Sequence, residues 1–197
     1  MFNSSKLFRV PIQSGTRKDA VVRFPSDSEF CERARKQRSI RRFLGRGKSE
    51  AEAIDSTSID AELFERIRND KDGVFFDASE AAAVLGKLER ATVESCEREG
   101  DDFRIVLKVP GAVTEHLVRM PTRKEMDRHE TASVKVTGAR RAQEIRGFLE
   151  PSGDLYDAIT KEVGGYEGSV PVVHKVAVVA EVLAQMAADD EEALPEA

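Results

Sequence analysis

The sequence predicts an α+β protein made of two tandem copies of one small module, each a β-hairpin followed by about three helices. Three observations lead to this prediction. An eight-residue pattern occurs twice, its flanking segments recur in the same order, and each copy changes from strand-like alternation to helical spacing at the same point. Each repeated stretch, with its flanking segments, is long enough to form one structural unit, so its recurrence predicts two similar units in succession.

The repeated pattern is V-R-apolar-P-[S/T]-x-x-E, which occupies residues 22–29 and 118–125, 96 positions apart. Proline lacks the amide proton that a central strand needs, so it marks the end of a strand. The Ser or Thr and the Glu three residues later form a capping box, which satisfies the free amides at a helix start. We therefore expect a strand to turn into a helix at this proline in both copies.

Segments on both sides of the pattern recur as well. The upstream pair consists of apolar runs closed by proline, and the downstream pairs have helical spacing. From first copy to second, the corresponding segments are 7–11 with 106–110, 60–67 with 152–159, and 81–93 with 173–185. The downstream spacing of 92 positions indicates small deletions in loops of the second copy, where they cost little.

Local patterns place the elements of each copy. The expected strands are 7–12, 20–24, 94–99, 103–109 and 115–120, and the expected helices beyond the capping boxes are 59–69, 79–93, 154–163 and 172–186. Residues 100–102, Gly-Asp-Asp, are typical of a tight hairpin turn that joins the copies stiffly. The sequence thus predicts a first module at 1–97 and a second at 98–186, followed by an acidic disordered tail at 187–197.

The composition is that of a soluble globular protein. The chain of 197 residues is 40% hydrophobic and 34% charged, and it contains no Trp. No apolar run is long enough to cross a bilayer and the first residues lack the apolar core of a signal peptide, so we expect a cytoplasmic protein. Cys31 and Cys96 have no CxxC spacing, which favours buried thiols over a disulfide or a zinc site.

Motifs for catalysis and cofactor binding fit the sequence poorly. Residues 47–49, Gly-Lys-Ser, resemble the end of a phosphate-binding P-loop, but Arg42 occupies the position where that loop needs glycine. The three histidines have no metal-ligand spacing, which favours surface or half-buried roles. They are His116, His129 and His174. No GxSxG elbow is present, and we expect a non-enzymatic protein with no catalytic residues, cofactor or metal.

One stretch of the chain is strongly basic. Its cations, with no acid among them, are Arg33, Arg35, Lys36, Arg38, Arg41, Arg42, Arg46 and Lys48. Such a cluster can neutralise phosphates, yet only Phe43 is available to stack on a base. A solvated or protein-contacting basic arm is the favoured interpretation, and nucleic-acid binding stays open as the alternative.

The repeated pattern resembles that of a known protein family. Residues 107–110, Leu-Lys-Val-Pro, and 117–122, Leu-Val-Arg-Met-Pro-Thr, are similar to the opening of tail assembly chaperones of long-tailed bacteriophages. The first copy matches through residues 10–11 and 22–26, and residues 155–186 also resemble phage tail-region proteins. The resemblance implies a chaperone that binds tape-measure or tail-tube subunits, with no catalytic residues. Family members are usually single copies, so a tandem arrangement is a departure.

The last expected helix, 172–186, supplies the candidate contact residues. It is apolar nearly all round, which indicates burial on more than one side. Val173, Val176, Ala180 and Leu183 are the candidate contacts for a tape-measure or tail-tube partner, with core packing as the alternative for each. The alternative functions are a structural protein of the virion, in tail or capsid, and a nucleic-acid-binding protein. The expected location is the host cytoplasm, or the finished particle for a virion protein.

Overall fold

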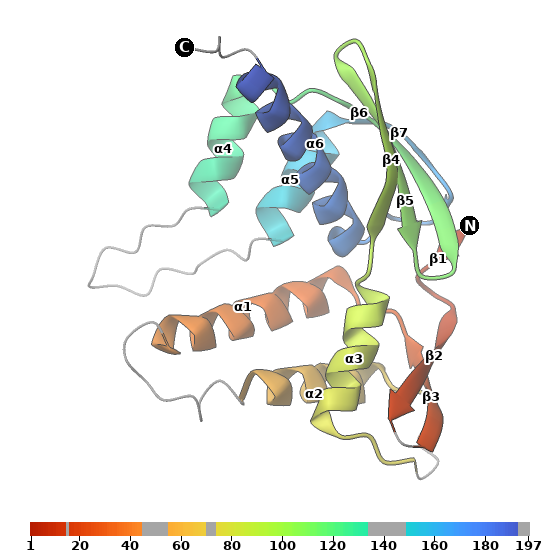
Figure 1. The fold of residues 1–197 in the computed structure, drawn as a ribbon. Helices are drawn as coiled ribbons and strands as arrows, with labels where there is room; N and C mark the ends of the chain where they lie inside the picture. The colour runs from red at the N-terminus through yellow and green to blue at the C-terminus, as the bar shows by residue number, and fades with distance from the viewer. Residues whose placement is uncertain (15, 45–54, 70–73, 134–148, 193–197) are drawn as a thin grey trace.

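The computed structural model describes residues 1–14, 16–44, 55–69, 74–133 and 149–192, and it confirms the α+β class (Figure 1). The strands are β1 (Phe2–Asn3), β2 (Leu7–Ser14), β3 (Thr16–Arg23), β4 (Thr92–Glu99), β5 (Asp102–Val109), β6 (Ala112–Arg119), β7 (Thr160–Gly164) and β8 (Tyr166–Glu167). The helices are α1 (Asp27–Leu44), α2 (Asp55–Ile67), α3 (Ala78–Leu88), α4 (Arg123–Ser133), α5 (Leu149–Ile159) and α6 (Val172–Glu192).

In the first half, the hairpin of β2 and β3 packs against three helices. The two strands are antiparallel and run in register along their whole length. Side chains alternate between the two faces of a strand, and the buried face consists of Val10, Ile12, Ala20 and Val22. These residues form a core with the apolar stripe of α3, which consists of Ala81, Val84, Leu85 and Leu88. Helices α1 and α2 lie side by side next to this core (Figure 1).

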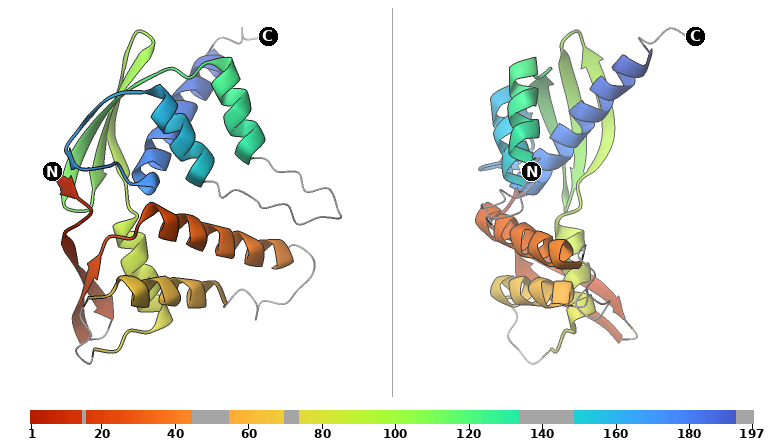
Figure 2. Two further views of the ribbon diagram at one scale, coloured as in Figure 1. Left: turned by 180° about the vertical axis from the view of Figure 1, so that it is seen from behind. Right: turned by 90° about the vertical axis from the view of Figure 1, so that its left-hand side faces the viewer.

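In the second half, an antiparallel sheet in the order β4-β5-β6-β7 carries its helices on one side (Figure 2). The alternation along β5 and β6 explains why one face is covered. The buried side chains of that face are Phe103, Ile105, Leu107, Val109, Thr114, His116 and Val118. Helix α6 contacts α5, β4 and β5. The uncovered face of the sheet carries ion pairs such as Arg104 with Glu99.

Several contacts besides the chain connection hold the two halves together. Strand β1 pairs in parallel with β8, and the Phe2 amide donates to the Gly165 carbonyl at 2.7 Å. The buried Phe2 ring meets Phe24 edge to face, with the ring centroids 5.1 Å apart. The Asp27 carboxylate accepts a hydrogen bond of 2.8 Å from the Val172 amide at the start of α6. The expected hairpin is formed by β4 and β5, but both of its strands belong to the sheet of the second half.

Two of the expected helices end earlier in the structure because the chain beyond them forms a strand. Helix α3 ends at Leu88 instead of residue 93, because the chain from Thr92 onward pairs with β5. Helix α5 occupies Leu149–Ile159 instead of 154–163, and the chain from Thr160 forms β7. Hydrogen bonding to β6 therefore overrides the helical spacing that led to the longer helix.

The last helix is longer than expected. Helix α6 continues to Glu192, so the expectation of a disordered tail is wrong for residues 187–192. Ala187 and Ala188 are strong helix formers, which favours continuation of the helix beyond its apolar part. Residues 193–197, the rest of the expected tail, lie outside the described residues.

The halves follow a common order of elements, with an alignment that differs from the expected one. Phe8 lies opposite Val22 and Phe103 opposite Val118, so the first strands correspond at a spacing of 95 positions, not 99. Pro11 therefore lies within β2, where its missing amide is tolerated because β2 pairs with β3 on one side alone. Helices α3 and α6 begin 94 positions apart, not 92. The duplication itself stays a proposal.

Candidate functional site

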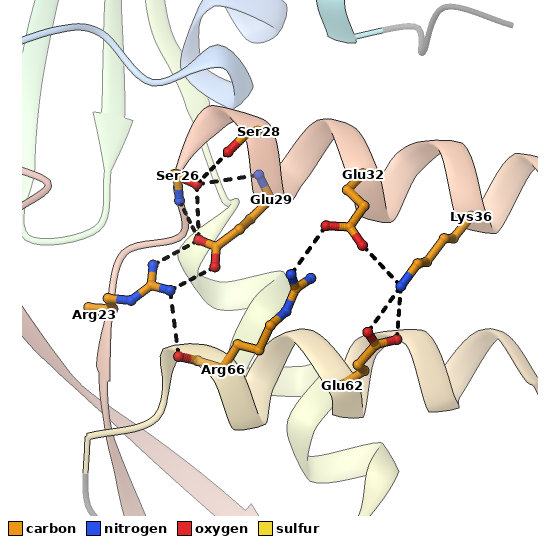
Figure 3. A network of polar contacts seen from close by, with 8 residues as sticks. All are labelled: Arg23, Ser26, Ser28, Glu29, Glu32, Lys36, Glu62 and Arg66. Carbon is orange, nitrogen blue, oxygen red and sulfur yellow. Dashed lines mark hydrogen bonds and ion pairs between the residues drawn. The ribbon is translucent and has the colours of Figure 1, made fainter. Parts of the chain in front are cut away.

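An arginine–glutamate contact, which we call the first clamp, holds the turn from β3 into α1 (Figure 3). The Arg23 guanidinium donates to both carboxylate oxygens of Glu29, at 2.8 and 2.7 Å. The same carboxylate accepts from the Ser26 amide at 2.9 Å, and the Ser26 hydroxyl accepts from the Glu29 amide at 3.3 Å. The predicted capping box is thus confirmed, with an arginine added to it. Arg23 also lies 3.5 Å from the Arg66 carbonyl in α2.

The second clamp holds the turn from β6 into α4 in the same way. Arg119 donates to both carboxylate oxygens of Glu125, at 2.9 and 2.6 Å. The Thr122 amide donates to this carboxylate at 2.8 Å, and the Thr122 hydroxyl accepts from the Glu125 amide at 3.4 Å. Arg119 also donates to the Ala158 carbonyl in α5, at 3.0 Å. Both copies of the repeated pattern therefore form the same local structure.

The clamps also direct the chain that follows the second helix of each half. Hydrogen bonds from the clamp arginines lower the pKa of Glu29 and that of Glu125 to about 2, so both carboxylates stay charged at neutral pH. Each arginine contacts a carbonyl at the end of the second helix of its half, and the chain beyond that helix returns to the clamped strand. The returning pairs are Arg68 with Val22 and Thr160 with Val118.

The described cations of the basic segment form ion pairs within the protein. These pairs are Arg33 with Asp60 and Glu89, Arg35 with Glu150, and Lys36 with Glu32 and Glu62. The side chains of Arg38, Arg41, Arg42, Arg46 and Lys48 lie outside the described residues. These three cations thus neutralise acids of the same chain, although the Arg35 side chain stays 53% exposed. Whether the segment contacts a protein or a nucleic acid stays a prediction.

The four expected contact residues share one stripe of α6. Val173, Val176 and Leu183 are half-buried, and Ala180 is exposed. The fully buried stripe of the same helix is a different one, formed by Val178, Val179 and Val182. Val173 and Leu183 also pack against the core, so the alternative of core packing holds in part for these two. Helix α6 therefore buries one stripe and leaves part of a second one accessible.

A buried polar network on the covered face of the sheet was missed by the sequence interpretation. Its members are Thr114 and His116 from β6, Tyr156 from α5, Tyr166 from β8 and His174 from α6. The Tyr156 hydroxyl lies 2.8 Å from His116 Nδ1, and the Tyr166 hydroxyl lies 3.1 Å from His174 Nδ1. Thr114 Oγ1 lies 3.2 Å from both His116 Nε2 and the Tyr166 hydroxyl. Both histidines are 0% exposed, so the surface or half-buried role expected for them is wrong.

One arrangement of protons satisfies every polar side-chain atom of the network except His174 Nε2. Tyr156 donates to His116 Nδ1, and His116 Nε2–H donates to Thr114. Thr114 donates to Tyr166, which in turn donates to His174 Nδ1. The reverse direction would leave the Tyr156 proton and a buried imidazole lone pair without partners, which is costly. In this arrangement both imidazoles are neutral.

The end of this network faces an aromatic ring. Among the described residues, His174 Nε2 has no hydrogen-bond partner, and the Phe2 ring centroid lies 4.9 Å from that of the imidazole, edge to face. Burial lowers the pKa of His116 to about 4 and, together with the nearby His116, that of His174 to about 3. Burial raises the pKa of Tyr166 to about 12.

The remaining candidates are placed as follows. His129 is half-buried, and its Nε2 lies 3.2 Å from the Ser152 hydroxyl. Cys31 is buried, as expected, and Cys96 is half-buried; both are free thiols. Within the described ranges, no three His, Cys, Asp or Glu side chains gather as metal ligands. None of the described helices is both long and apolar enough to cross a membrane.

Comparison with protein-family models, with curated proteins and with solved structures found no match for this chain.

Proposed function

We propose that the protein is a phage tail assembly chaperone that binds a helical segment of a tape-measure or tail-tube subunit along α6. The observation that carries this proposal is the accessible apolar stripe of the helix. It consists of Val173, Val176, Ala177, Ala180, Leu183 and Ala184, each half-buried or exposed. With a rise of 1.5 Å per residue, the stripe is about 17 Å long, or roughly three turns. An amphipathic partner helix of this length would bury it.

The charged side chains of α6 leave this stripe uncovered. Lys175 contacts Asp157 of α5 at 2.7 Å, and Glu181 accepts a hydrogen bond of 2.6 Å from Gln185 one turn later. The Lys175 side chain is held toward α5 and the Glu181 side chain along α6, so neither covers the stripe. The absence of charge within the stripe favours an apolar contact over an ionic one.

The family resemblance supports the same function through different residues. It depends on the strand, proline and capped helix of the repeated pattern, and both copies of that pattern form a clamp. We interpret the two halves as diverged copies of one module, in which the second copy has gained or kept the outer strands β4 and β7.

Co-expression with a tape-measure or tail-tube subunit of a long-tailed phage tests the proposal. The soluble fraction of that partner should rise when the chaperone is present. Val176→Lys with Ala180→Lys places two charges on the stripe and should abolish the effect, because burying unpaired charges is costly. The matched control is Ala83→Lys, at an exposed position of α3. Equal aggregation of the partner with and without the chain would refute the proposed function.

A further inference from the structure

Helices α1 and α2 are linked by ion pairs across their exposed side (Figure 3). Lys36 lies between two carboxylates, 3.1 Å from Glu32 and 3.0 Å from Glu62. Arg66 contacts Glu32 from the other helix, at 3.2 Å. The long side chains of Lys36 and Arg66 thus occupy the space between the two helices, and every charge in the set has a partner of opposite sign.

The clamps align α1 with α4 and α2 with α5, and this alignment identifies the residues of α4 and α5 that correspond to the ion-paired residues of α1 and α2. Arg23 and Arg119 make the same contacts 96 positions apart, which relates α1 to α4. The carbonyls of Arg66 and Ala158 accept from these two arginines 92 positions apart, which relates α2 to α5. The corresponding residues are therefore Glu32 and Arg128, Lys36 and Ala132, Glu62 and Asp154, and Arg66 and Ala158.

A groove lies between α4 and α5 at the place that the ion pairs fill in the first half. Its volume is about 340 Å³, and its lining includes Arg128, Ala132, Pro151, Asp154, Leu155 and Ala158. Alanine replaces both long cationic side chains here. The space between these two helices is therefore open, although the clamp and the helix pair around it are the same as in the first half.

Two opposite charges at this groove have no partner among the described residues. In the part of the chain that the structure describes, Arg128 and Asp154 make no hydrogen bond or ion pair through their side chains. The neighbouring carboxylates differ, since Glu125 is held by its clamp and Asp157 by Lys175. Counting only contacts with described residues, the groove thus presents an unpaired cation and an unpaired anion beside a floor that includes the buried Leu155.

We propose that the groove between α4 and α5 binds a helical segment of a partner polypeptide that carries one basic and one acidic side chain a turn apart. The basic group pairs with Asp154, as Lys36 pairs with Glu62 in the first half, and the acidic group pairs with Arg128. Residues four apart on a helix lie on one face, so a single turn supplies both charges. This surface is separate from the α6 stripe and does not depend on the partner being a tail protein.

Titration of the ¹⁵N-labelled protein with the helical peptide acetyl-(EAAAK)₃-amide tests this inference. The peptide carries Glu and Lys four positions apart, and at low salt it should shift the amide signals of the groove residues in a saturable way. The uncharged peptide acetyl-(QAAAQ)₃-amide should leave them unchanged. Ala132→Lys with Ala158→Glu should weaken binding by about tenfold or more, because the new side chains fill the groove and pair with Asp154 and Arg128.

A matched pair of variants separates the groove from the rest of the surface. Asp154→Asn should weaken peptide binding, whereas Glu62→Gln, at the corresponding position of the first half, should leave it unchanged. Shifts confined to other regions, equal binding by the filled variant, or no shifts at millimolar peptide would each overturn the inference. None of these outcomes bears on the co-expression result, so the two proposals fail separately.

Discussion

Geometry as well as charge determines what each clamp arginine does. A guanidinium donates two parallel hydrogen bonds to one carboxylate, whereas an ammonium group acts as a point charge. Arg119 uses a further donor on the Ala158 carbonyl, so a single side chain joins β6, α4 and α5. Loss of the two parallel hydrogen bonds to Glu125 should therefore destabilise the turn from β6 into α4 and the pairing of β7 with β6.

Substitution of Arg119 by lysine tests this role of the second clamp. We expect the free energy of unfolding to fall by about 1 kcal/mol, because the charge is kept but the paired hydrogen bonds to Glu125 are lost. Urea denaturation followed by circular dichroism measures it. The control Arg123→Lys, at an exposed position in the same turn, should change the free energy by less than about 0.5 kcal/mol. Equal effects of the two variants would contradict the clamp.

The buried histidines predict a loss of stability in mild acid. Their pKa values of about 4 and about 3 in the folded protein lie below the value of about 6.5 in an unfolded chain. Between these values the unfolded chain binds more protons, so the free energy of unfolding falls as the pH falls from about 6.5 toward 4. The slope approaches about 1.4 kcal/mol per pH unit for each histidine.

Denaturation measured across pH 7 to 4.5 checks this, with His174→Gln as the comparison. Glutamine can accept from Tyr166 and cannot titrate, so the variant should lose less stability across that range. The clamp carboxylates contribute in a lower window, because their stabilisation is lost only as the pH falls from about 4.5 toward 2. An identical pH slope in the variant would mean that His174 does not titrate on unfolding.

At the level of single residues, the sequence predicted the capping boxes and missed the polar network. A capping box is local, because its two side chains are three residues apart. The network joins residues from four elements, so no spacing reveals it. One signal was present: His116 is in phase with the buried Val118 two residues later, on the covered face of an alternating strand.

Strand β7 depends on a glycine that no other residue replaces without strain. Gly165 has a φ of +87°, and a Cβ atom there would lie 2.8 Å from the Val113 carbonyl oxygen. Gly165→Ala should therefore destabilise the protein by at least about 2 kcal/mol. Gly86→Ala should stabilise it by about 0.5 to 1 kcal/mol, because Gly86 is helical and has open space around it. Thermal unfolding of both variants measures this, and shifts of the same sign would be the contrary result.

At the level of elements, local patterns gave the kind and order of most helices and strands but not all their ends. The apolar spacing of Leu155, Ile159 and Val163 favours a helix through residue 163. That helix would leave the edge of β6 unpaired, and β7 pairs with it instead. Helical periodicity cannot show this, because the pairing depends on a strand more than forty residues earlier in the sequence.

At the level of the whole molecule, the two halves differ in what they bury and expose. The first half closes the space between its second and first helices with ion pairs, and the second half leaves a groove there. In place of the buried Ala20, the second half has His116 at the corresponding position of its strand. The repeated pattern predicted the common scaffold, but these differences arise from side chains outside the pattern.

Local sequence patterns also did not predict the contacts between the halves. Phe2 stands in a two-residue strand that no periodicity predicts, yet it is buried against residues of both halves. Its position depends on β8, more than 160 residues later in the chain. The sequence indicated a joint at the β4–β5 hairpin and gave no sign of this second one.

Hydrogen exchange on the complex obtained by co-expression tests most directly the claim that the second half contacts a helical partner. Peptides spanning α6 should exchange more slowly in the complex than in the free protein, while those spanning α1 to α3 should be unchanged. Slower exchange confined to the first half, or none anywhere, would contradict the claim.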